Sequence, residues 1–374
     1  MGERDSIRDI IGTSAAQAAA ISTPILSPLV ISSLIVGLGI GELEAGELIT
    51  LELLIIGVSS IALAPLMPRI SFRILAAAAA LFLVAAHTLS SQTDSLDSLF
   101  LWRILAGLCI GCLTAAVNAA IAQSRSPALL YGLAWAAGYT TSAILALLVT
   151  RNNEVVSYQQ VYFALAMVMV VLLPLLWLMP RHQYETSTRG KEKLDFPPGI
   201  MLLIAVTLIG LSMMAYYAFL GQLAISIGST AKQTGWILAL VQVAGIIGGL
   251  SVAPVSNRLG VLKSLLVVAP LHAIAIMLAI WTPNTLVLGL AAFFEAVLFI
   301  IMTPLMFTLA ANIDKQGRWA AAAAGTFTLS TAFGPIIGAV FIEHSGYSAI
   351  AWMQVLALLP ALLIFIWVNS KIKK

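Results

Sequence analysis

Apolar runs of about 18–25 residues recur from one end of this 374-residue chain to the other. Each run is long enough to cross the roughly 30 Å hydrocarbon core of a bilayer as an α-helix. A transmembrane β-barrel would instead need strands of about ten residues with alternating polarity. Runs such as Ile74–Ala86 do not alternate. The sequence therefore predicts an all-α polytopic membrane protein.

Composition supports this reading, because only 9% of the residues are charged and 60% are hydrophobic. A soluble domain has about 25% charged residues, so this chain cannot cover a water-facing surface of its own size. Hydropathy and turn residues predict twelve transmembrane helices. They are expected at residues 13–40, 48–66, 74–91, 99–122, 128–149, 160–179, 199–225, 235–253, 264–281, 286–311, 320–341 and 349–368.

One long polar stretch, "RHQYETSTRGKEKLDFPP", divides the predicted helices into two groups of six. We therefore expect an N-terminal six-helix bundle over residues 1–180 and a C-terminal six-helix bundle over residues 199–374. Residues 181–198 form the linker between them.

Lysine and arginine placement predicts the orientation in the membrane. Of the 19 Lys and Arg residues, all but three lie in one alternate set of polar segments, which includes the linker. The opposite loops hold only Arg151 and Lys232, and Arg103 lies inside a span. By the positive-inside rule, both termini and the linker are cytoplasmic. The net charge of +3 then reflects membrane topology, and no nucleic-acid partner is expected.

Two short motifs recur in the two halves of the chain. "AGELI" and "APLMPRISFR" border the second predicted span, and "TGWIL" and "APVSNRLGVLK" border the eighth. Homologous halves related by an axis along the membrane normal place a substrate site at their interface near mid-bilayer. Four residue pairs share one separation along the chain: Gly46 with Gly235, Ala64 with Ala253, Pro65 with Pro254, and Arg69 with Arg258.

The fourth predicted span carries the clearest motif, "RILAGLCIG", which has the spacing R-x-x-x-G-x-x-x-G. With its 6 + 6 spans, basic central loop and this motif, the whole chain resembles the major facilitator superfamily of transporters. The resemblance implies that fold, with two pseudo-symmetric bundles. It assigns conformational roles to Gly107 and Gly111, for which a helix-packing face is the alternative. It assigns the same role to the "GPIIG" motif of the eleventh span, Gly334, Pro335 and Gly338.

The loop after the second span matches the superfamily pattern only in part. Arg69 and Arg73 fit the pattern, but Pro68 stands where the family has an acid. In the second copy Arg258 fits, and Asn257 replaces the acid. The gating salt bridge that the family attributes to this acid is therefore not expected here.

Arg103 is the most unusual residue of the predicted spans, because a charge at the bilayer centre costs roughly 2.5–3.5 kcal/mol. We expect it to face a cavity or a carboxylate, with lipid snorkelling as the alternative. Glu295, about 14 Å deep by helical rise, is the first candidate partner, and Glu52 is the second. The resemblance implies proton coupling for Arg103. Because of its depth we expect Glu295 to be a protonation or substrate site, and Glu52 is a further candidate for coupling and gating. A structural pair is the alternative for Glu295, and a solvated interfacial position is the alternative for Glu52.

Polar and aromatic side chains within the spans are candidates for the substrate site, with interhelical packing as the alternative. Pro24 and Pro28 predict a bent first span, because proline removes helix hydrogen bonds. Cys109 and Cys112 are expected to pack as small apolar residues, without a metal. His272 is expected to be structural. The candidate substrate-binding residues are Gln17, Asn118, Trp135, Tyr139, Tyr216 and Tyr217.

The leading functional prediction is a secondary active transporter of a small organic solute, proton-coupled and working by alternating access. Export is favoured, since no substrate-specific uptake motif is present. The alternative is a proton-coupled uptake symporter of an organic acid, sugar or siderophore. A transport-dead sensor or a membrane-embedded enzyme is a further alternative, but four histidines without an HExxH motif supply no catalytic constellation. We expect a monomer in a bacterial inner membrane, with solute, protons and lipid as partners and no cofactor.

Overall fold

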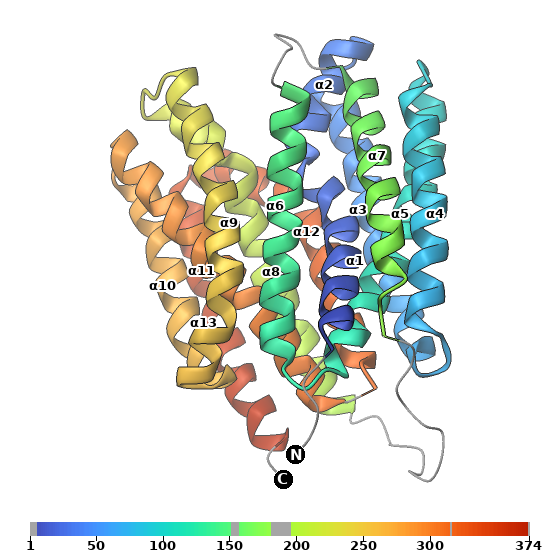
Figure 1. Cartoon of the computed structure of the whole chain (residues 1–374). Helices are drawn as coiled ribbons and strands as arrows, with labels where there is room; N and C mark the ends of the chain where they lie inside the picture. The colour runs from blue at the N-terminus through green and yellow to red at the C-terminus, as the bar shows by residue number, and fades with distance from the viewer. Residues whose placement is uncertain (1–5, 151–156, 181–195, 315, 373–374) are drawn as a thin grey trace.

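The computed structural model describes residues 6–150, 157–180, 196–314 and 316–372 (Figure 1). These residues form helices joined by short connections. The helices are α1 (Ile7–Ile25), α2 (Ser27–Leu38), α3 (Glu42–Leu63), the 3₁₀ helix η1 (Ala64–Arg69), α4 (Phe72–Ser91), α5 (Leu96–Ala122), α6 (Pro127–Thr150), α7 (Tyr158–Leu176), α8 (Phe196–Ser226), α9 (Ala231–Leu259), α10 (Val261–Trp281), α11 (Thr285–Ile313), α12 (Arg318–Ser345) and α13 (Ser348–Ile372).

Twelve membrane crossings account for these helices. Eleven are single helices long and apolar enough to span a bilayer, and α1 with α2 makes a twelfth that bends by 51°. Pro24 lies inside α1, one residue before that helix ends. A proline in this position removes a helix hydrogen bond and clashes with the preceding turn, which explains the predicted bend.

The two copies of the repeated loop motif fold differently. In the first copy, the α-helix stops at Leu63 and the chain continues as η1, which contains Pro65 and Pro68. In the second copy, α9 runs on to Leu259 with Pro254 inside it, several residues beyond the predicted end of this span. A second proline within three residues removes another donor, and short 3₁₀ turns are common at such helix ends.

Helix packing is mostly between neighbours within each half of the sequence. In the first half, α5 packs on α3 and α4, α4 on α7, and α1 on α6; in the second, α8 packs on α12 and α13, and α11 on α9 and α10. The main contacts between the halves are α3 with α12 and α6 with α9, and α12 also packs on α5 while α11 packs on α6 and α5. Both chain ends lie at one end of the molecule (Figure 1), which we call the terminal side.

Glycines bring the joining helices into backbone contact. A Cβ atom on Gly57 of α3 would lie 2.9 Å from the carbonyl oxygen of Gly325 on α12. A Cβ atom on Gly249 of α9 would lie 2.9 Å from the carbonyl oxygen of Gly132 on α6. Such small residues let helix backbones approach closely. We call Gly57, Gly325, Gly132 and Gly249 the glycine seam.

Hydrogen bonds also join the halves on the terminal side. Ser60 Oγ donates to the carbonyl oxygen of Ala321 at 3.2 Å. Gln123 Nε2 donates to the carbonyl oxygen of Gln316 at 3.4 Å. In this structure the two halves are therefore in contact on the terminal side.

The predicted linker, residues 181–198, falls largely outside the described residues, which omit 181–195. Its last part belongs to α8, which begins at Phe196, slightly before the predicted start. Pro197 and Pro198 suit the first turn of a helix, where an amide hydrogen has no intrahelical acceptor.

Candidate functional site

Arg103 lies on α5 and is fully buried, with 0% exposure. Its Nη1 atom is 3.5 Å from Oε1 of Glu52 on α3. Its Nη2 atom donates to Ser90 Oγ at 2.6 Å and to the carbonyl oxygen of Ala86 at 3.3 Å, both on α4. Full burial excludes lipid snorkelling as the explanation of this arginine.

Three further side chains complete the surroundings of Arg103, and the sequence alone did not indicate them. His87 Nδ1 lies 3.3 Å from Arg103 Nη2, and His87 Nε2 lies 3.4 Å from Thr23 Oγ1 on α1. The guanidinium carbon is 4.3 Å from the ring centroid of Tyr162 on α7. A guanidinium only donates, so His87 Nδ1 accepts and its proton sits on Nε2. We call this set the arginine network: Arg103, Glu52, His87, Ser90, Tyr162 and Thr23.

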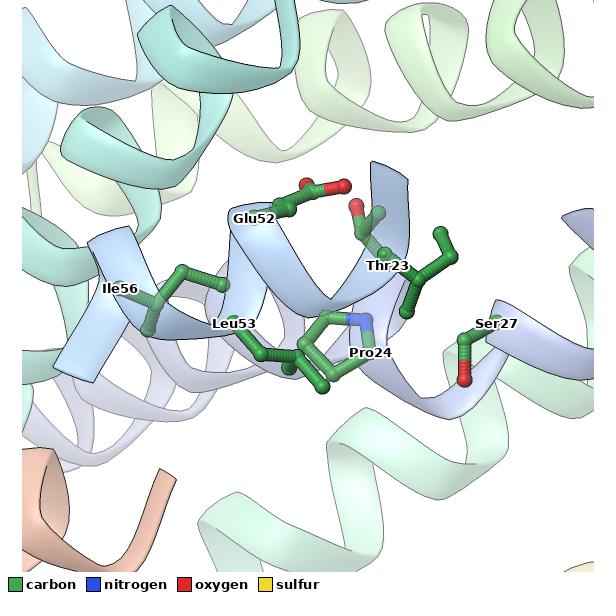
Figure 2. Close-up of a pocket in the computed structure, with 7 residues that line it drawn as sticks. Thr23, Pro24, Ser27, Glu52, Leu53 and Ile56 are labelled. Carbon is green, nitrogen blue, oxygen red and sulfur yellow. The ribbon is translucent and has the colours of Figure 1, made fainter. Parts of the chain in front are cut away.

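A small cavity touches Glu52 where α1 gives way to α2. It holds about 10 Å³, roughly the room of one water molecule. Figure 2 shows Glu52 and Thr23 facing the same space, with Pro24 and Ser27 below them. Its apolar walls are Ile49, Leu53 and Ile56. The arginine network therefore adjoins the bend of the first span.

Glu295 on α11 has a different partner from the one expected first. Its Oε1 atom lies 3.0 Å from Nε2 of His272 on α10, and its exposure is 3%. The structure therefore pairs Arg103 with the second candidate, Glu52, and not with Glu295. The reason is topological, because Arg103 and Glu52 share one half while Glu295 and His272 share the other. His272, expected to be structural, contacts the deepest carboxylate of the second half.

Tyrosines from both halves lie within electrostatic reach of Glu295. Tyr216 and Tyr217 on α8 and Tyr139 on α6 interact electrostatically with its carboxylate. The ring of Tyr139 stacks on that of Trp135, with centroids 6.2 Å apart. These side chains include four of the six predicted substrate-binding residues. We call the set the Glu295 cluster: Glu295, His272, Trp135, Tyr139, Tyr216 and Tyr217.

Several buried polar atoms in this region have no hydrogen-bond partner. They include Nε1 of Trp135, the hydroxyl of Tyr216 and Oε1 of Gln242. Gln242 lies one helical turn from Gly245, against which the ring of Tyr139 packs. Buried polar groups in native proteins are normally hydrogen-bonded, so these atoms are available to bond with water or a ligand. The Glu295 cluster is therefore the candidate solute site.

The remaining two predicted substrate residues lie in the first half. Gln17 is buried on α1, and Asn118 is buried on α5. Asn118 Nδ2 donates to the carbonyl oxygen of Thr114 at 2.8 Å, while its Oδ1 atom has no partner.

The glycines of the span-4 motif form a packing face against α3. A Cβ atom on Gly107 would lie 3.0 Å from the carbonyl oxygen of Glu52, and one on Gly111 would lie 2.8 Å from that of Ile56. Gly334 and Gly338 of α12 likewise meet α8, where a Cβ atom on Gly338 would lie 3.0 Å from that of Ala215; Pro335 lies between them inside α12.

The arginines of the loop motifs lie on the terminal side. Arg69 ends η1 and is exposed, and Arg258 is exposed near the end of α9. Arg73 Nε donates to the carbonyl oxygen of Met179 at 2.8 Å. This bond ties the start of α4 to the chain that follows α7.

Metal-binding groups were also sought. Cys109 and Cys112 are free thiols on α5. Within the part of the chain that the structure describes, no three His, Cys, Asp or Glu side chains form a group that could hold a metal.

The family model of the Major Facilitator Superfamily matches residues 12–313 and again residues 202–374. The chain belongs to the major facilitator superfamily. Two solved structures share its fold. One is the human organic anion transporter MFSD10 (TETRAN), with a TM-score of 0.78 and 12% identity over 97% of this chain and 100% of that one. The other is FucP, a superfamily transporter in the outward conformation, with a TM-score of 0.79 and 14% identity over 97% and 98%. No curated protein matches the sequence.

Family membership confirms the resemblance and the twelve-helix superfamily fold. The protein is an integral membrane protein of a transporter family, and secondary transport is its general activity. Members of this superfamily are typically not enzymes.

Proposed function

We propose that the protein is a proton-coupled secondary transporter that exports a small organic solute by alternating access. Residues 1–180 and 199–374 act as two six-helix bundles, and solute binds between them at the Glu295 cluster. The protein works as a monomer in a bacterial inner membrane with both termini cytoplasmic, as the distribution of basic residues indicates.

The observation that carries this proposal is the buried Glu295–His272 pair beside tyrosines of both halves. Carboxylates and imidazoles are side chains that exchange protons, and the imidazole is the one that does so near physiological pH. Arg103 keeps its proton under all such conditions, so the Arg103–Glu52 pair has a fixed charge on one side. We therefore assign proton coupling to Glu295 with His272. The arginine network supports the bent first span.

Coupling follows from the position of the pair between the halves. Tyr139 belongs to the first half and interacts with Glu295 of the second. A proton on Glu295 removes the negative charge of its carboxylate and so changes the electrostatic interaction with Tyr139. The protonated and ionised forms of Glu295 therefore favour different arrangements of the two halves. A ligand shifts such an equilibrium by its difference in affinity for the two states. Proton binding and solute binding can thus be linked.

Reconstituted vesicles test the proposal. Purified protein in proteoliposomes with an entrapped pH-sensitive dye is given a panel of organic cations, organic acids and sugars. We expect at least one solute to drive proton movement, and Glu295→Gln to abolish it. Glu343→Gln removes an exposed carboxylate near the end of α12 and is the matched control, expected to behave as wild type. Solute movement that carries no protons in the wild type would overturn proton coupling.

A further inference from the structure

The Glu295 cluster offers a solute one carboxylate and aromatic rings, but no free cation. Arg103 is engaged by Glu52, Ser90 and Tyr162 in the other half. The other described lysines and arginines lie at helix ends or between helices. With the imidazole of His272 neutral, the charge that this site presents to a solute is therefore negative while Glu295 is ionised and zero when it is protonated.

Because the site is buried, its charge favours solutes of the opposite charge. An ion that leaves water for a buried site loses its hydration, and this cost is recovered only by an opposite charge or by dipoles of the correct sign. A buried anion would meet the carboxylate of Glu295 and the negative faces of tyrosine rings. A cation would gain from both, since aromatic faces, Trp most strongly, attract cations.

The geometry points to an organic cation with an apolar body as the substrate class of this site. We propose that its positive charge takes the place of the proton on Glu295, while its apolar body lies against Trp135, Tyr139 and Tyr216. This inference rests on the proposed function, because it names the solute of the same site.

Gln242 refines the kind of cation. Its unpartnered Oε1 atom is an acceptor one turn from the contact between Gly245 and Tyr139. A protonated amine has N–H groups to donate to this oxygen, whereas a quaternary cation has none. Protonated amines therefore gain one hydrogen bond over quaternary cations of the same size.

One carboxylate that accepts either a proton or a cation makes the two ligands mutually exclusive. The other titratable groups facing it are His272 on α10, Tyr139 on α6, and Tyr216 and Tyr217 on α8. Those of α9, α12 and α13 lie at helix ends, and Arg103 of α5 belongs to the arginine network. A proton added to the carboxylate or to the imidazole makes the site more positive, and either change opposes a bound cation. The result is exchange of protons for cations.

Equilibrium binding with two probes of one shape and opposite charge tests this inference. Radiolabelled tetraphenylphosphonium and tetraphenylborate are dialysed against the full chain in nanodiscs at pH 5.5 and pH 8.5, with empty nanodiscs subtracted. We expect saturable binding of the phosphonium that is weaker at pH 5.5 than at pH 8.5, because protons and the cation compete for one site. The borate should show no saturable binding.

Variants assign the effect to the site. Glu295→Gln should remove the pH dependence of phosphonium binding and weaken it at pH 8.5, whereas Glu343→Gln should keep both. Gln242→Leu should weaken binding of a protonated amine, propranolol, more than binding of the phosphonium. Elution as a single sharp size-exclusion peak shows that each variant is folded.

The outcomes separate this inference from the proposed function. Saturable borate binding, or phosphonium binding that Glu295→Gln leaves unchanged, overturns the cation site. If an organic acid or sugar drives proton movement in vesicles while the phosphonium does not bind, proton-coupled transport stands and the cation site is wrong. If the phosphonium binds in competition with protons but no solute moves protons, the site stands and the transport mechanism is wrong.

Discussion

Arg103 and Glu52 lie 3.5 Å apart on two helices of the same half, α5 and α3. A pair across the two halves would break when they separate, and its carboxylate would change its proton affinity in that step. The Arg103–Glu52 pair would not break in that step, because both residues belong to the same half. For this reason the proposed coupling is centred on Glu295 and His272 and not on separation of Arg103 from a carboxylate.

His272→Ala is expected to lower the thermal stability of the protein in detergent. The substitution leaves the buried carboxylate of Glu295 without its partner at 3.0 Å, and an unsatisfied buried group costs about 1–3 kcal/mol. The double variant with Glu295→Gln should recover part of the loss, since an amide is cheaper to bury than a charge. Equal unfolding temperatures for wild type and His272→Ala would show that the pair is unimportant for stability.

Arg103→Ala is expected to destabilise the protein by about 3–5 kcal/mol, because it leaves Glu52 as an uncompensated buried charge. Arg103→Lys should recover only part of the lost stability, since an ammonium lacks the planar arrangement of donors with which the guanidinium contacts several acceptors. Denaturant-induced unfolding followed by tryptophan fluorescence measures these differences.

The double variant Arg103→Met/Glu52→Leu separates charge from packing in the same network. Replacing both members of a buried ion pair by apolar residues is often neutral or stabilising. We expect it to be more stable than Arg103→Ala. Equal losses in the two variants would mean that the contacts with Ser90 and Tyr162, and not the buried charge of Glu52, dominate.

Gly111→Leu is expected to block transport while leaving membrane insertion intact. Even a Cβ atom at this position would clash with Ser59 and lie 2.8 Å from the carbonyl oxygen of Ile56 on α3. The larger side chain pushes α3 from α5, and α3 carries Gly57 of the glycine seam on another face. Solute flux and the amount of protein in the membrane are measured together. Gly221→Ala, where nothing lies within 4 Å of the added atom, is the control and should retain normal flux.

Cysteine labelling tests the predicted orientation. A cysteine in the linker, residues 181–198, or at Lys371 should be shielded from an impermeant thiol reagent in intact, right-side-out cells. A cysteine at Glu44 or Glu47, in the acidic segment at the start of α3, should be labelled. Labelling of the linker from outside would reverse the orientation.

Most of the fold followed from the sequence, because apolar length alone determines where a chain crosses a bilayer. The spans, the bend near Pro24 and the superfamily fold are all present in the structure. The predicted ends of the spans were less accurate where a helix continued beyond its apolar residues. α9 extends through the polar residues of "SNRL" to Leu259, since a helix at the membrane surface can continue into water.

Several residues of the Glu295 cluster could be chosen from the sequence, but the contacts that they make could not. Tyr139, Tyr216, Tyr217 and Glu295 were chosen as polar or aromatic residues in apolar spans, and the fold brings them together. The partners His87 and His272 were not chosen, because one histidine in an apolar run gives no sign of which carboxylate or cation it meets. Contacts between helices distant in sequence depend on helix rotation, which one sequence does not specify.

The glycine seam has a consequence for how freely this sequence can vary. At Gly57, Gly132, Gly249 and Gly325 the backbones of the two halves approach closely, and the side chains of Leu329, Ile61 and Val252 occupy the space that a larger residue would need. Lipid tails are as apolar as leucine, so no hydrophobic force holds such helices together. A larger residue at any of these four positions would keep the two halves from closing against each other on one side of the membrane. These four positions carry no reactive group, yet at each of them a larger residue would force the two halves to shift.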